Sequence, residues 1–519
     1  MEFHPSFSTI IAISFSVILL AFLLHILIKK RATMWKNNLK PPQAKGALPI
    51  IGHLHLLGGP KLPHHVLGDM AERDGPIFTI KLGVHEALVV TNASIAKACF
   101  TTNDKVFASR PKAEATKLMG YNYALFAFTP YGDYWRQMRK MVKYEILSPR
   151  QVEMFGPVRG SELKTSLRDL YDGWVKNKIS QNSETVKVEM SQWFGNLVVN
   201  IMGRIITGKR FRDDEGVRFQ NVVKMFFELM GAFVVSDFIP YLKWLDVGGY
   251  RKAMKKTAID LDNIFEGWLK EHKKECKSDE GSIINTLISV LQCASEDEFP
   301  GFDHDTIIKS TCQQLLIAGL DTTSGTLTWA LALLLKNPQT LKIAQDEIDE
   351  HVGRERPVDE SDMKKLVYLN AVIKETLRLY PAAPLLVPHE SMENCIVGGY
   401  QIPKGTRLLV NLYKMHRDPN IWEDPLEFRP ERFLVIDKHI DFRGNHYELL
   451  PFGSGRRICP GINFSVQAVS LILASLIQQF VLKNSSDEPI DMSESSGLTI
   501  WKTTPLEVLL APRLSSNMY

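Results

Sequence analysis

The side chain with the clearest chemical potential in this sequence is Cys459, in the glycine-rich stretch PFGSGRRICPG, residues 451–461. The apolar run Ile462 to Phe480 follows at once and predicts a helix. A cysteine at such a junction meets free backbone N–H groups and the positive end of the helix dipole, and both favour thiolate over thiol. A thiolate is a soft ligand that suits iron. A buried structural cysteine in a tight turn is the alternative interpretation.

The residues around this cysteine favour a flat cofactor. Gly453, Gly455 and Gly461 would let the backbone turn sharply and approach such a cofactor closely. The full pattern Phe-x-x-Gly-x-Arg-x-Cys-x-Gly is present from Phe452 to Gly461, and it is the haem-thiolate signature of the cytochrome P450 superfamily. The chain resembles that superfamily from Pro41 to its end, and in its details it resembles the plant microsomal group.

The resemblance implies a mainly α-helical fold with small β-sheets, formed by residues 53–519 as one catalytic domain. It also implies a b-type haem with Cys459 as the axial ligand to iron and with Phe452, Gly453 and Gly461 beside it. A reductase would supply electrons from NADPH, and O2 would be cleaved to hydroxylate a hydrophobic small molecule. Thiolate ligation favours that cleavage.

A long helical pattern must position the residues that handle oxygen. It covers residues 305–336, with an aspartate at 303 or 305 as its N-cap, and carries AGLDTTS at 318–324 in its middle. Because hydroxyl side chains compete for backbone carbonyls, we expect a local distortion there that makes room for O2 and water. The resemblance implies that Thr322 holds a proton donor near bound oxygen and that Asp321 links it to solvent.

Other elements are predicted from shorter patterns. Residues 77–81 and 87–91 predict two strands joined by a turn at Gly83. Residues 212–268 contain two amphipathic helical patterns, and the resemblance places them over the substrate channel.

Aromatic and cationic side chains that suit the acidic edge of a haem occur at two places. Trp135 and Arg139 are four residues apart and therefore share a helix face, although a surface helix with an aromatic patch gives the same pattern. The resemblance implies that this pair and Arg457 reach the haem propionates. The nearby Lys140 and Lys143 would then lie where an acidic face of the reductase docks.

A second charged group is predicted to brace the cysteine loop. Glu375 and Arg378 are three residues apart, a spacing that also describes many ordinary surface pairs. The resemblance adds Arg432 and makes the three a buried network. Breaking such a network by removing one member would leave an unpaired buried charge.

The substrate pocket is predicted from the resemblance, since an irregular proline-rich segment, residues 381–388, would pass beside the haem. His389 stands where many relatives carry an arginine that contacts a propionate, and a neutral or protonated imidazole can still donate a hydrogen bond there. The expected pocket residues are Phe233, Val235, Ala318, Ala383, Leu386, Val387, Leu498 and Ile500.

These pocket residues are apolar, which favours a neutral terpenoid or a phenolic such as a flavonoid. The group that the chain resembles also contains nicotine N-demethylases, so an alkaloid is the alternative substrate, with Asp237 and Asp321 as the obvious carboxylates for its cation. A reductase-independent haem-thiolate isomerase or dehydratase, and a catalytically silent haem scaffold, are further alternatives. Neither matches a chain in which the motifs around Asp321, Thr322 and Cys459 are all intact.

The first residues predict a membrane anchor. Residues 7–28 form an apolar run long enough to cross a bilayer, and the basic residues 29–31 follow it. The positive-inside rule places the rest of the chain on the cytosolic face of the endoplasmic reticulum, with residues 1–31 as the anchor and 32–52 as a proline- and glycine-rich hinge. A cleaved signal peptide is the alternative, but its basic cluster would precede the apolar run.

Composition sets outer limits. The 519 residues are 45% hydrophobic and 23% charged, with a net charge of +4 that gives no reason to expect nucleic acid as a partner. The six cysteines show no Cys-x-x-Cys spacing, so neither a zinc site nor a disulfide framework is indicated.

Overall fold

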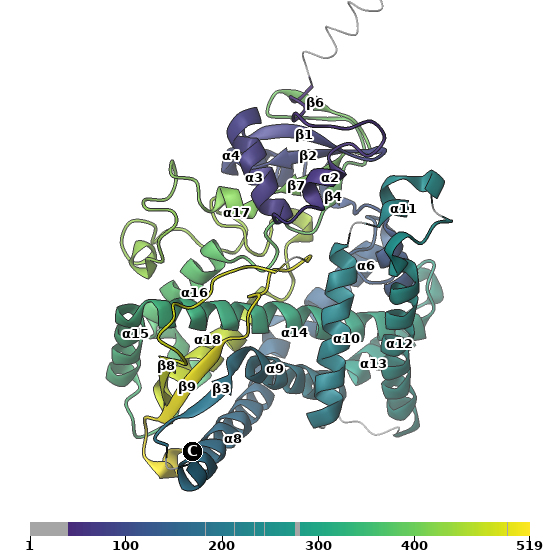
Figure 1. The fold of residues 1–519 in the computed structure, drawn as a ribbon. Helices are drawn as coiled ribbons and strands as arrows, with labels where there is room; N and C mark the ends of the chain where they lie inside the picture. The colour runs from purple at the N-terminus through teal and green to yellow at the C-terminus, as the bar shows by residue number, and fades with distance from the viewer. Residues whose placement is uncertain are drawn as a thin grey trace, which may run out of the picture.

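The computed structural model describes residues 40–519 except 182, 212, 233, 243, 276–280 and 496. The predicted membrane-spanning run and the basic cluster after it lie outside the described residues, and so does Phe233. The rest forms a small lobe rich in strands above a larger helical lobe (Figure 1). The expected mainly α-helical fold with small sheets is confirmed.

The strand-rich lobe is built on a four-stranded sheet with the order β1-β2-β7-β4. The first two strands are the predicted pair, and they are antiparallel, whereas β7 runs parallel to β2. Gly83 forms the turn with a φ of +60°, and a Cβ there would lie 2.1 Å from the carbonyl oxygen of Phe238, so only glycine fits. The strands are β1 (Ile77–Leu82), β2 (His85–Val90), β4 (His389–Glu390) and β7 (Arg407–Val410).

Two smaller sheets complete the strands. One joins the middle of the chain to its C-terminal part in the order β3-β9-β8, and the other is the hairpin β5-β6. Their strands are β3 (Val186–Glu189), β8 (Phe480–Asn484), β9 (Glu507–Pro512), β5 (Cys395–Val397) and β6 (Tyr400–Ile402).

Helices make up most of the described chain (Figure 1). The short helices α2, α5, α7, α11 and α17 connect longer ones, and α6 continues into a π-helical turn at Val142–Ile146. In chain order the α-helices are α2 (Leu54–Leu57), α3 (Pro63–Asp74), α4 (Ala93–Phe100), α5 (Glu114–Met119), α6 (Asp133–Met141), α7 (Pro149–Met154), α8 (Gly156–Gln181), α9 (Met190–Thr207), α10 (Asp213–Gly231), α11 (Val235–Phe238), α12 (Tyr250–Glu275), α13 (Ile283–Cys293), α14 (His304–Lys336), α15 (Pro338–His351), α16 (Val367–Leu379), α17 (Leu412–Met415) and α18 (Ile462–Gln479).

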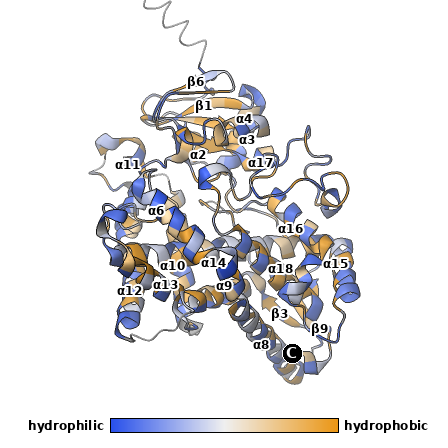
Figure 2. Cartoon of the chain, turned by 180° about the vertical axis from the view of Figure 1, so that it is seen from behind, coloured by the Kyte–Doolittle hydropathy of each residue, from blue (hydrophilic) through white to orange (hydrophobic). Residues whose placement is uncertain are grey.

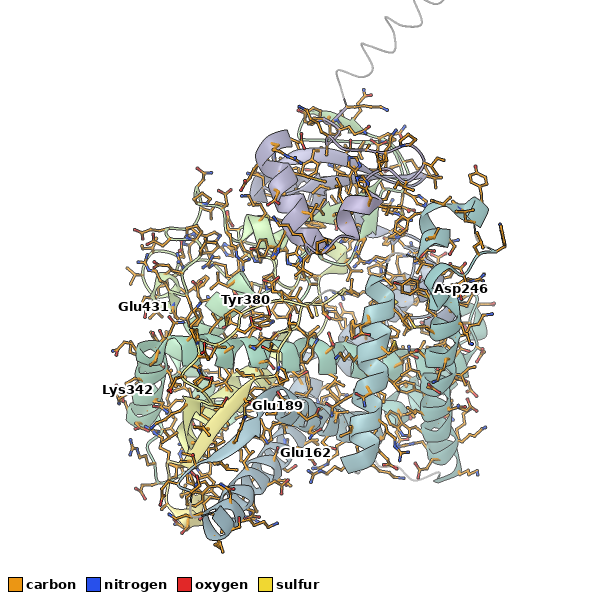
Figure 3. All side chains as sticks on the ribbon, in the orientation of Figure 1. Glu162, Glu189, Asp246, Lys342, Tyr380 and Glu431 are labelled. Carbon is orange, nitrogen blue, oxygen red and sulfur yellow. The ribbon has the colours of Figure 1, made fainter. Side chains whose placement is uncertain are left out.

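Helix α14 is the centre of the helical lobe, and α9, α12, α16 and α18 pack around it. It begins after Asp303, whose side chain accepts a hydrogen bond of 2.9 Å from the Thr306 amide, as the sequence predicts for an N-cap. Hydrophobic residues are frequent along α14 and α18 (Figure 2). Tyr380 stacks on Trp329 of α14, with 4.0 Å between ring centroids (Figure 3).

The stretch 318–324 does not interrupt α14, which is helical over all 33 residues. The hydroxyl of Thr322 donates to the Ala318 carbonyl at 2.7 Å, and that of Ser324 donates to Leu320. The expected competition for carbonyls is present, but it leaves the helix intact. Room beside this stretch comes instead from the small residues Ala318 and Gly319, which line a cavity.

The predicted amphipathic patterns before residue 268 correspond to α10 and α12, with α11 between them. Phe238 and Ile239 at the end of α11 pack with Phe78 and Ile80 of β1. The segment between α10 and α12 is therefore connected to the strand-rich lobe by direct apolar contact.

Two described segments, residues 215–238 and Ile462–Gln479, are long and apolar enough to cross a membrane. The second is α18, most of which is buried inside the helical lobe, so its hydropathy is explained by core packing.

Candidate active site

The Cys459 loop is a compact turn held by its own backbone. The Cys459 amide donates to the Phe452 carbonyl at 3.0 Å, and the Gly453 amide donates to Leu450 at 2.9 Å. Gly455 has a φ of +67°, and a Cβ there would lie 2.3 Å from Asp104 Oδ1. The loop therefore needs glycine at this position to contact α4 and the turn after it.

The sulfur of Cys459 is buried, and burial raises the pKa of its thiol, whereas the Gly461 amide and the charge of Arg139 lower it. The Gly461 amide thus acts in the direction that the sequence predicts, but in the protein by itself desolvation has the larger effect on this pKa. A thiolate at this place needs a bound cation. A Cβ at Gly461 would lie 3.8 Å from the sulfur, so a glycine keeps the space beside it open.

Cys459 lines a cavity of about 280 Å³ that runs between its loop and α14. None of the described residues around this cavity is a carboxylate. Residues that the sequence assigns to the cofactor or the reaction and that line it are Trp135, Arg139, Ala318, Thr322, Ala383, Leu386, Val387, His389, Phe452, Gly453, Arg457, Cys459 and Gly461.

Three guanidinium groups, from Arg110, Arg139 and Arg457, gather at this cavity. Burial and the charges of the other two lower the pKa of Arg457 to about 8, and burial lowers that of Arg110 to about 9. Arg139 has no ion-pair or hydrogen-bond partner among the described residues. Such a concentration of cations without an acid favours an anionic ligand that brings carboxylates into the cavity.

Backbone carbonyls fix the orientation of two of these groups. Arg457 donates to the carbonyls of Ala108, Phe126 and Thr129 at 2.7, 3.1 and 2.6 Å, and its guanidinium lies 4.3 Å from the centre of the Trp135 ring. The predicted association of Trp135, Arg139 and Arg457 is thus present as a spatial cluster.

Arg110 was not predicted from the sequence. It donates to the carbonyls of Ala127, Val387 and Pro388 at 3.1, 2.5 and 2.9 Å. Those acceptors belong to loops remote in sequence, and no spacing rule connects a lone arginine to them.

His389 is buried beside Arg110 and Arg457, and burial holds its pKa well below the usual value, so the ring is neutral. Its Nδ1 lies 2.7 Å from the Phe107 carbonyl, which can only accept, so Nδ1 carries the proton. The remaining nitrogen, Nε2, is an acceptor. The hydrogen bond that this imidazole can donate therefore goes to the Phe107 carbonyl, and Arg110 is a nearby donor on the cavity wall.

The predicted network of Glu375, Arg378 and Arg432 is present and buried. Arg378 Nε lies 2.7 Å from Glu375 Oε2, and Arg432 Nε lies 3.1 Å from Glu375 Oε1. Arg378 also donates to the carbonyls of His416, Pro425 and Glu427. The charges therefore fix the path of residues 416–432.

His416 connects this network to the cysteine loop and was also not predicted. Its Nδ1 donates to the Arg378 carbonyl at 3.1 Å, and its Nε2 accepts from the Leu450 amide at 3.0 Å. Burial and the charge of Arg378 lower its pKa to about 3, so the ring is neutral and keeps this tautomer. Leu450 directly precedes the loop, which is thereby tied to α16.

The side chain of Asp321 is buried and does not contact bulk solvent directly. It is 5% exposed, and its carboxylate accepts hydrogen bonds from Thr499 Oγ1 at 2.6 Å and Trp501 Nε1 at 2.9 Å. Burial raises its pKa to about 6, although both donors act against this shift. Thr322, the next residue, lines the cavity.

Four of the predicted substrate-pocket residues line the Cys459 cavity: Ala318, Ala383, Leu386 and Val387. Leu498 lines an adjoining cavity, which shares Arg110, Leu386 and Val387 with the first. Val235 packs instead in the cluster under β1 and β2, and Ile500 is 3% exposed and lines neither cavity. Phe233 lies outside the described residues.

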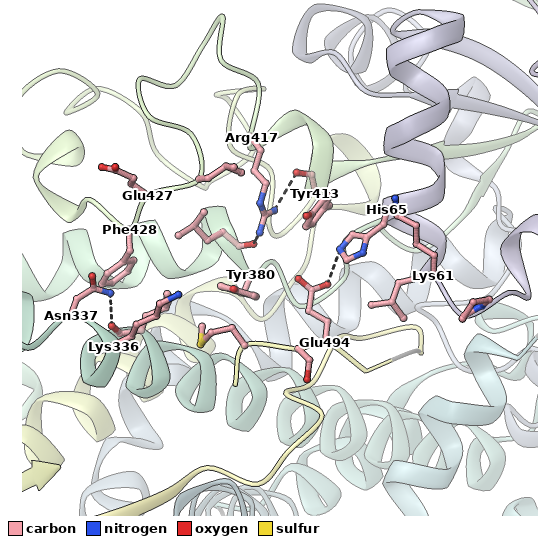
Figure 4. A pocket seen from close by; sticks show the side chains of 17 residues that line it. Lys61, His65, Lys336, Asn337, Tyr380, Tyr413, Arg417, Glu427, Phe428 and Glu494 are labelled. Atoms are coloured by element: carbon pink, nitrogen blue, oxygen red, sulfur yellow. Dashed lines mark hydrogen bonds and ion pairs between the residues drawn. The ribbon is translucent and has the colours of Figure 1, made fainter. Parts of the chain in front are cut away.

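A larger cavity, of about 830 Å³, lies elsewhere, between α3, the end of α14 and the C-terminal loop. It is polar: Figure 4 shows His65 and Glu494 facing each other and Arg417 beside Tyr413. It contains neither Cys459 nor Thr322, so size alone does not identify the site of chemistry.

The family model for cytochrome P450 matches residues 41–510. The chain belongs to the cytochrome P450 family. Among curated proteins, this P450 is 47% identical to demethylepipodophyllotoxin synthase of Sinopodophyllum hexandrum over 94% of its own length and 95% of that protein. It is 47% identical to strychnine-10-hydroxylase of Strychnos nux-vomica, covering 93% of each chain. It is 49% identical to flavonoid-6-hydroxylase of Mentha piperita, covering 92% of this chain and 94% of that protein.

Among solved structures, a zebra fish cytochrome P450 with progesterone superposes with a TM-score of 0.72 at 26% identity, covering 87% of this P450 and all of that chain. The cavity residues fit the haem of the family: a buried sulfur that needs a cation, three cations without an acid, and an open space at Gly461. This P450 is therefore a haem-thiolate monooxygenase that receives NADPH-derived electrons through a reductase.

Proposed function

We propose that this P450 hydroxylates a neutral, oxygenated, ring-rich plant metabolite, with phenolics of the flavonoid and coumarin type and terpenoids as its substrate class. The observation that carries the proposal is an apolar cavity between Cys459 and Thr322 without a described carboxylate. Asp321 is occupied by Thr499 and Trp501, and Asp237 accepts from the Glu114 amide at 2.8 Å in the adjoining cavity. Both acids therefore already accept hydrogen bonds from the protein, and neither lines the Cys459 cavity.

Relatives named flavonoid-6-hydroxylase and xanthotoxin 5-hydroxylase, the latter 45% identical, support this substrate class. A second candidate substrate is an alkaloid, because the chain is also 47% identical to strychnine-10-hydroxylase. The engaged state of Asp237 and Asp321 favours the neutral substrate of the two.

The roles of the site residues follow from their positions. Cys459 holds the haem iron, while Trp135, Arg139, Arg457 and Arg110 bind the propionates. Bound haem supplies an oxygen atom activated from O2 and two electrons. Thr322 holds a proton donor in the cavity, and Asp321 passes protons toward it. Ala318, Ala383, Leu386 and Val387 exclude water and orient the substrate.

The remaining expectations are part of the proposal. Residues 1–31 hold the protein in the endoplasmic reticulum membrane by a single span, 32–52 form a hinge, and 53–519 form the cytosolic catalytic domain. Lys140 is exposed on the helix that carries Trp135 and Arg139, and Lys143 is exposed in the turn that follows it. They steer the acidic face of the reductase.

The test uses microsomes that contain the full chain and its reductase. We expect a carbon-monoxide difference spectrum typical of thiolate-ligated haem, and hydroxylated product from flavonoids, coumarins or terpenoids that depends on NADPH and O2. Turnover of alkaloids alone would support the second candidate. Turnover that persists without NADPH and reductase would show an isomerase or dehydratase, and would overturn the proposal.

A further inference from the structure

The acid next to Thr322 is held by a loop from the far end of the chain. Thr499 Oγ1 donates to Oδ2 of Asp321, and Trp501 Nε1 donates to Oδ1, so each carboxylate oxygen has its own donor. More than 170 residues separate these donors from Asp321. The Trp501 ring also lies over Gly325, where an added Cβ would be 3.7 Å from it. The indole thus covers the helical turn that follows the acid.

The loop is fastened at further points around the same site. The Ile500 amide donates to Ala382 at 3.0 Å, next to Ala383 of the cavity wall, and Trp329 donates to the Ile500 carbonyl at 3.3 Å. The two ends of the loop are joined by an antiparallel β-bridge between the backbones of Glu494 and Lys502. Its conformation is therefore coupled to the wall of the substrate cavity.

The same loop also reaches the substrate side, because Leu498 lines the cavity that adjoins the Cys459 cavity. Leu498 and Thr499 are neighbours in sequence, so one contacts the space for substrate while the other holds the acid. A displacement of this short segment changes both.

We propose that Thr499 and Trp501 are positioning residues for proton delivery, which they perform by stabilising the carboxylate form of Asp321 and fixing its direction. The inference rests on the monooxygenase activity proposed above. In each delivery Asp321 releases one proton toward Thr322 and regains one from solvent. The two donors stabilise the carboxylate that exists between these transfers. Proton delivery therefore depends on the position of the loop, which also borders the space for substrate.

The charged side chains on the same loop bind other groups and do not stabilise the carboxylate of Asp321. Among the described residues, Thr499 and Trp501 are the two whose hydrogen bonds lower the pKa of Asp321 against the effect of burial. On the same loop, Lys502 donates to the Thr504 carbonyl at 3.0 Å, and Glu494 lies 2.6 Å from His64 of α3. Removing one donor is therefore expected to raise the pKa of Asp321 by about one unit, the equivalent of one hydrogen bond to a charged group.

The experiment compares Thr499→Val with Thr499→Ser in the full-length holoenzyme with its reductase. The valine has the shape of threonine without its hydroxyl, whereas serine keeps the donor. Product formed per NADPH consumed, and peroxide released, are measured against pH. We expect the midpoint of the coupling profile to move up by about one pH unit in Thr499→Val and to stay in place in Thr499→Ser. Trp501→Phe should act in the same direction.

A second readout does not depend on turnover. Hydrogen exchange of the peptide that contains residues 498–503 should become faster in Thr499→Val and Asp321→Asn, and stay at the wild-type rate in Thr499→Ser. Faster exchange with an unmoved pH midpoint would show a purely structural role and overturn the inference. If no substrate of the proposed class turns over, NADPH consumption, peroxide release and exchange still report on Asp321, so the two proposals fail separately.

Discussion

Arg378 and Glu375 form an ion pair with no exposed side-chain surface, in which Arg378 Nε lies 2.7 Å from Glu375 Oε2. Its guanidinium also donates to the carbonyls of His416, Pro425 and Glu427, and His416 extends the connection to Leu450 beside the cysteine loop. The pair therefore positions the cysteine loop indirectly, through the backbone carbonyls that Arg378 binds and through His416.

The first prediction concerns this pair. Arg378→Ala leaves the carboxylate of Glu375 buried without its main partner, and we expect a loss of about 3–5 kcal/mol in the free energy of unfolding, with little or no bound haem. Haem content and thermal melting measure both effects. Lys342→Ala removes an exposed pair with Asp346 on α15 (Figure 3) and should change stability by less than about 0.5 kcal/mol. Normal haem content in Arg378→Ala would contradict the assignment.

The second prediction concerns Arg110, which the structure adds to the cofactor site. Arg110→Leu removes a buried cation and its hydrogen bonds to the Val387 and Pro388 carbonyls. We expect haem to dissociate roughly ten to a hundred times faster, the equivalent of one charge-assisted hydrogen bond. Transfer of haem to an acceptor globin measures the rate. Lys112→Leu, at an exposed site two residues away, is the control. Equal rates in both variants would remove Arg110 from the site.

The third prediction is a pH dependence of stability. Burial raises the pKa of Asp321 to about 6 in the folded protein, above its ordinary value of 3.8, so the folded state holds this proton more tightly than the unfolded state. Its contribution to stability is present below about pH 4 and is lost as the pH rises through 6. Asp321→Asn should therefore flatten the fall in melting temperature across this window. An unchanged slope would show that Asp321 ionises as easily in the fold as in water.

The fourth prediction separates Thr322 from a neighbour of the same type. Both Thr322 and Thr328 donate to the carbonyl four residues earlier, at 2.7 and 2.8 Å, but Thr328 does not line the cavity. Thr322→Ala should lower product formed per NADPH by about tenfold or more and raise peroxide release, since a positioned proton donor contributes at least that much. Thr328→Ala should stay close to wild type. A similar loss in both would point to the helix and not to proton delivery.

Local patterns predicted much of the site. The turn of the cysteine loop, the N-cap at Asp303 and the strand pair around Gly83 all depend on neighbours within a few residues. Such short-range geometry is fixed by chain sterics and hydrogen bonding, so it can be predicted directly from the sequence. The spacing of Glu375 and Arg378 alone favours an ordinary surface pair, and their buried network was predicted from the family resemblance.

Contacts between remote segments could not be predicted. Arg110 bonds to carbonyls 277 and 278 residues away, and Asp321 meets donors 178 and 180 residues away. A carbonyl exists at every position and so carries no sequence signal. The burial of Asp321 could not be predicted for the same reason: its surroundings are set by the C-terminal loop and not by α14.

The C-terminal position of Thr499 and Trp501 has a consequence during synthesis of the protein. Synthesis delivers the helix that carries Asp321 long before the loop that orients it, and Cys459 also precedes that loop. A chain that ends before Thr499 would carry Asp321 without either of its donors. The hydrogen-bonded arrangement around this acid is therefore completed only when the last part of the chain has been made.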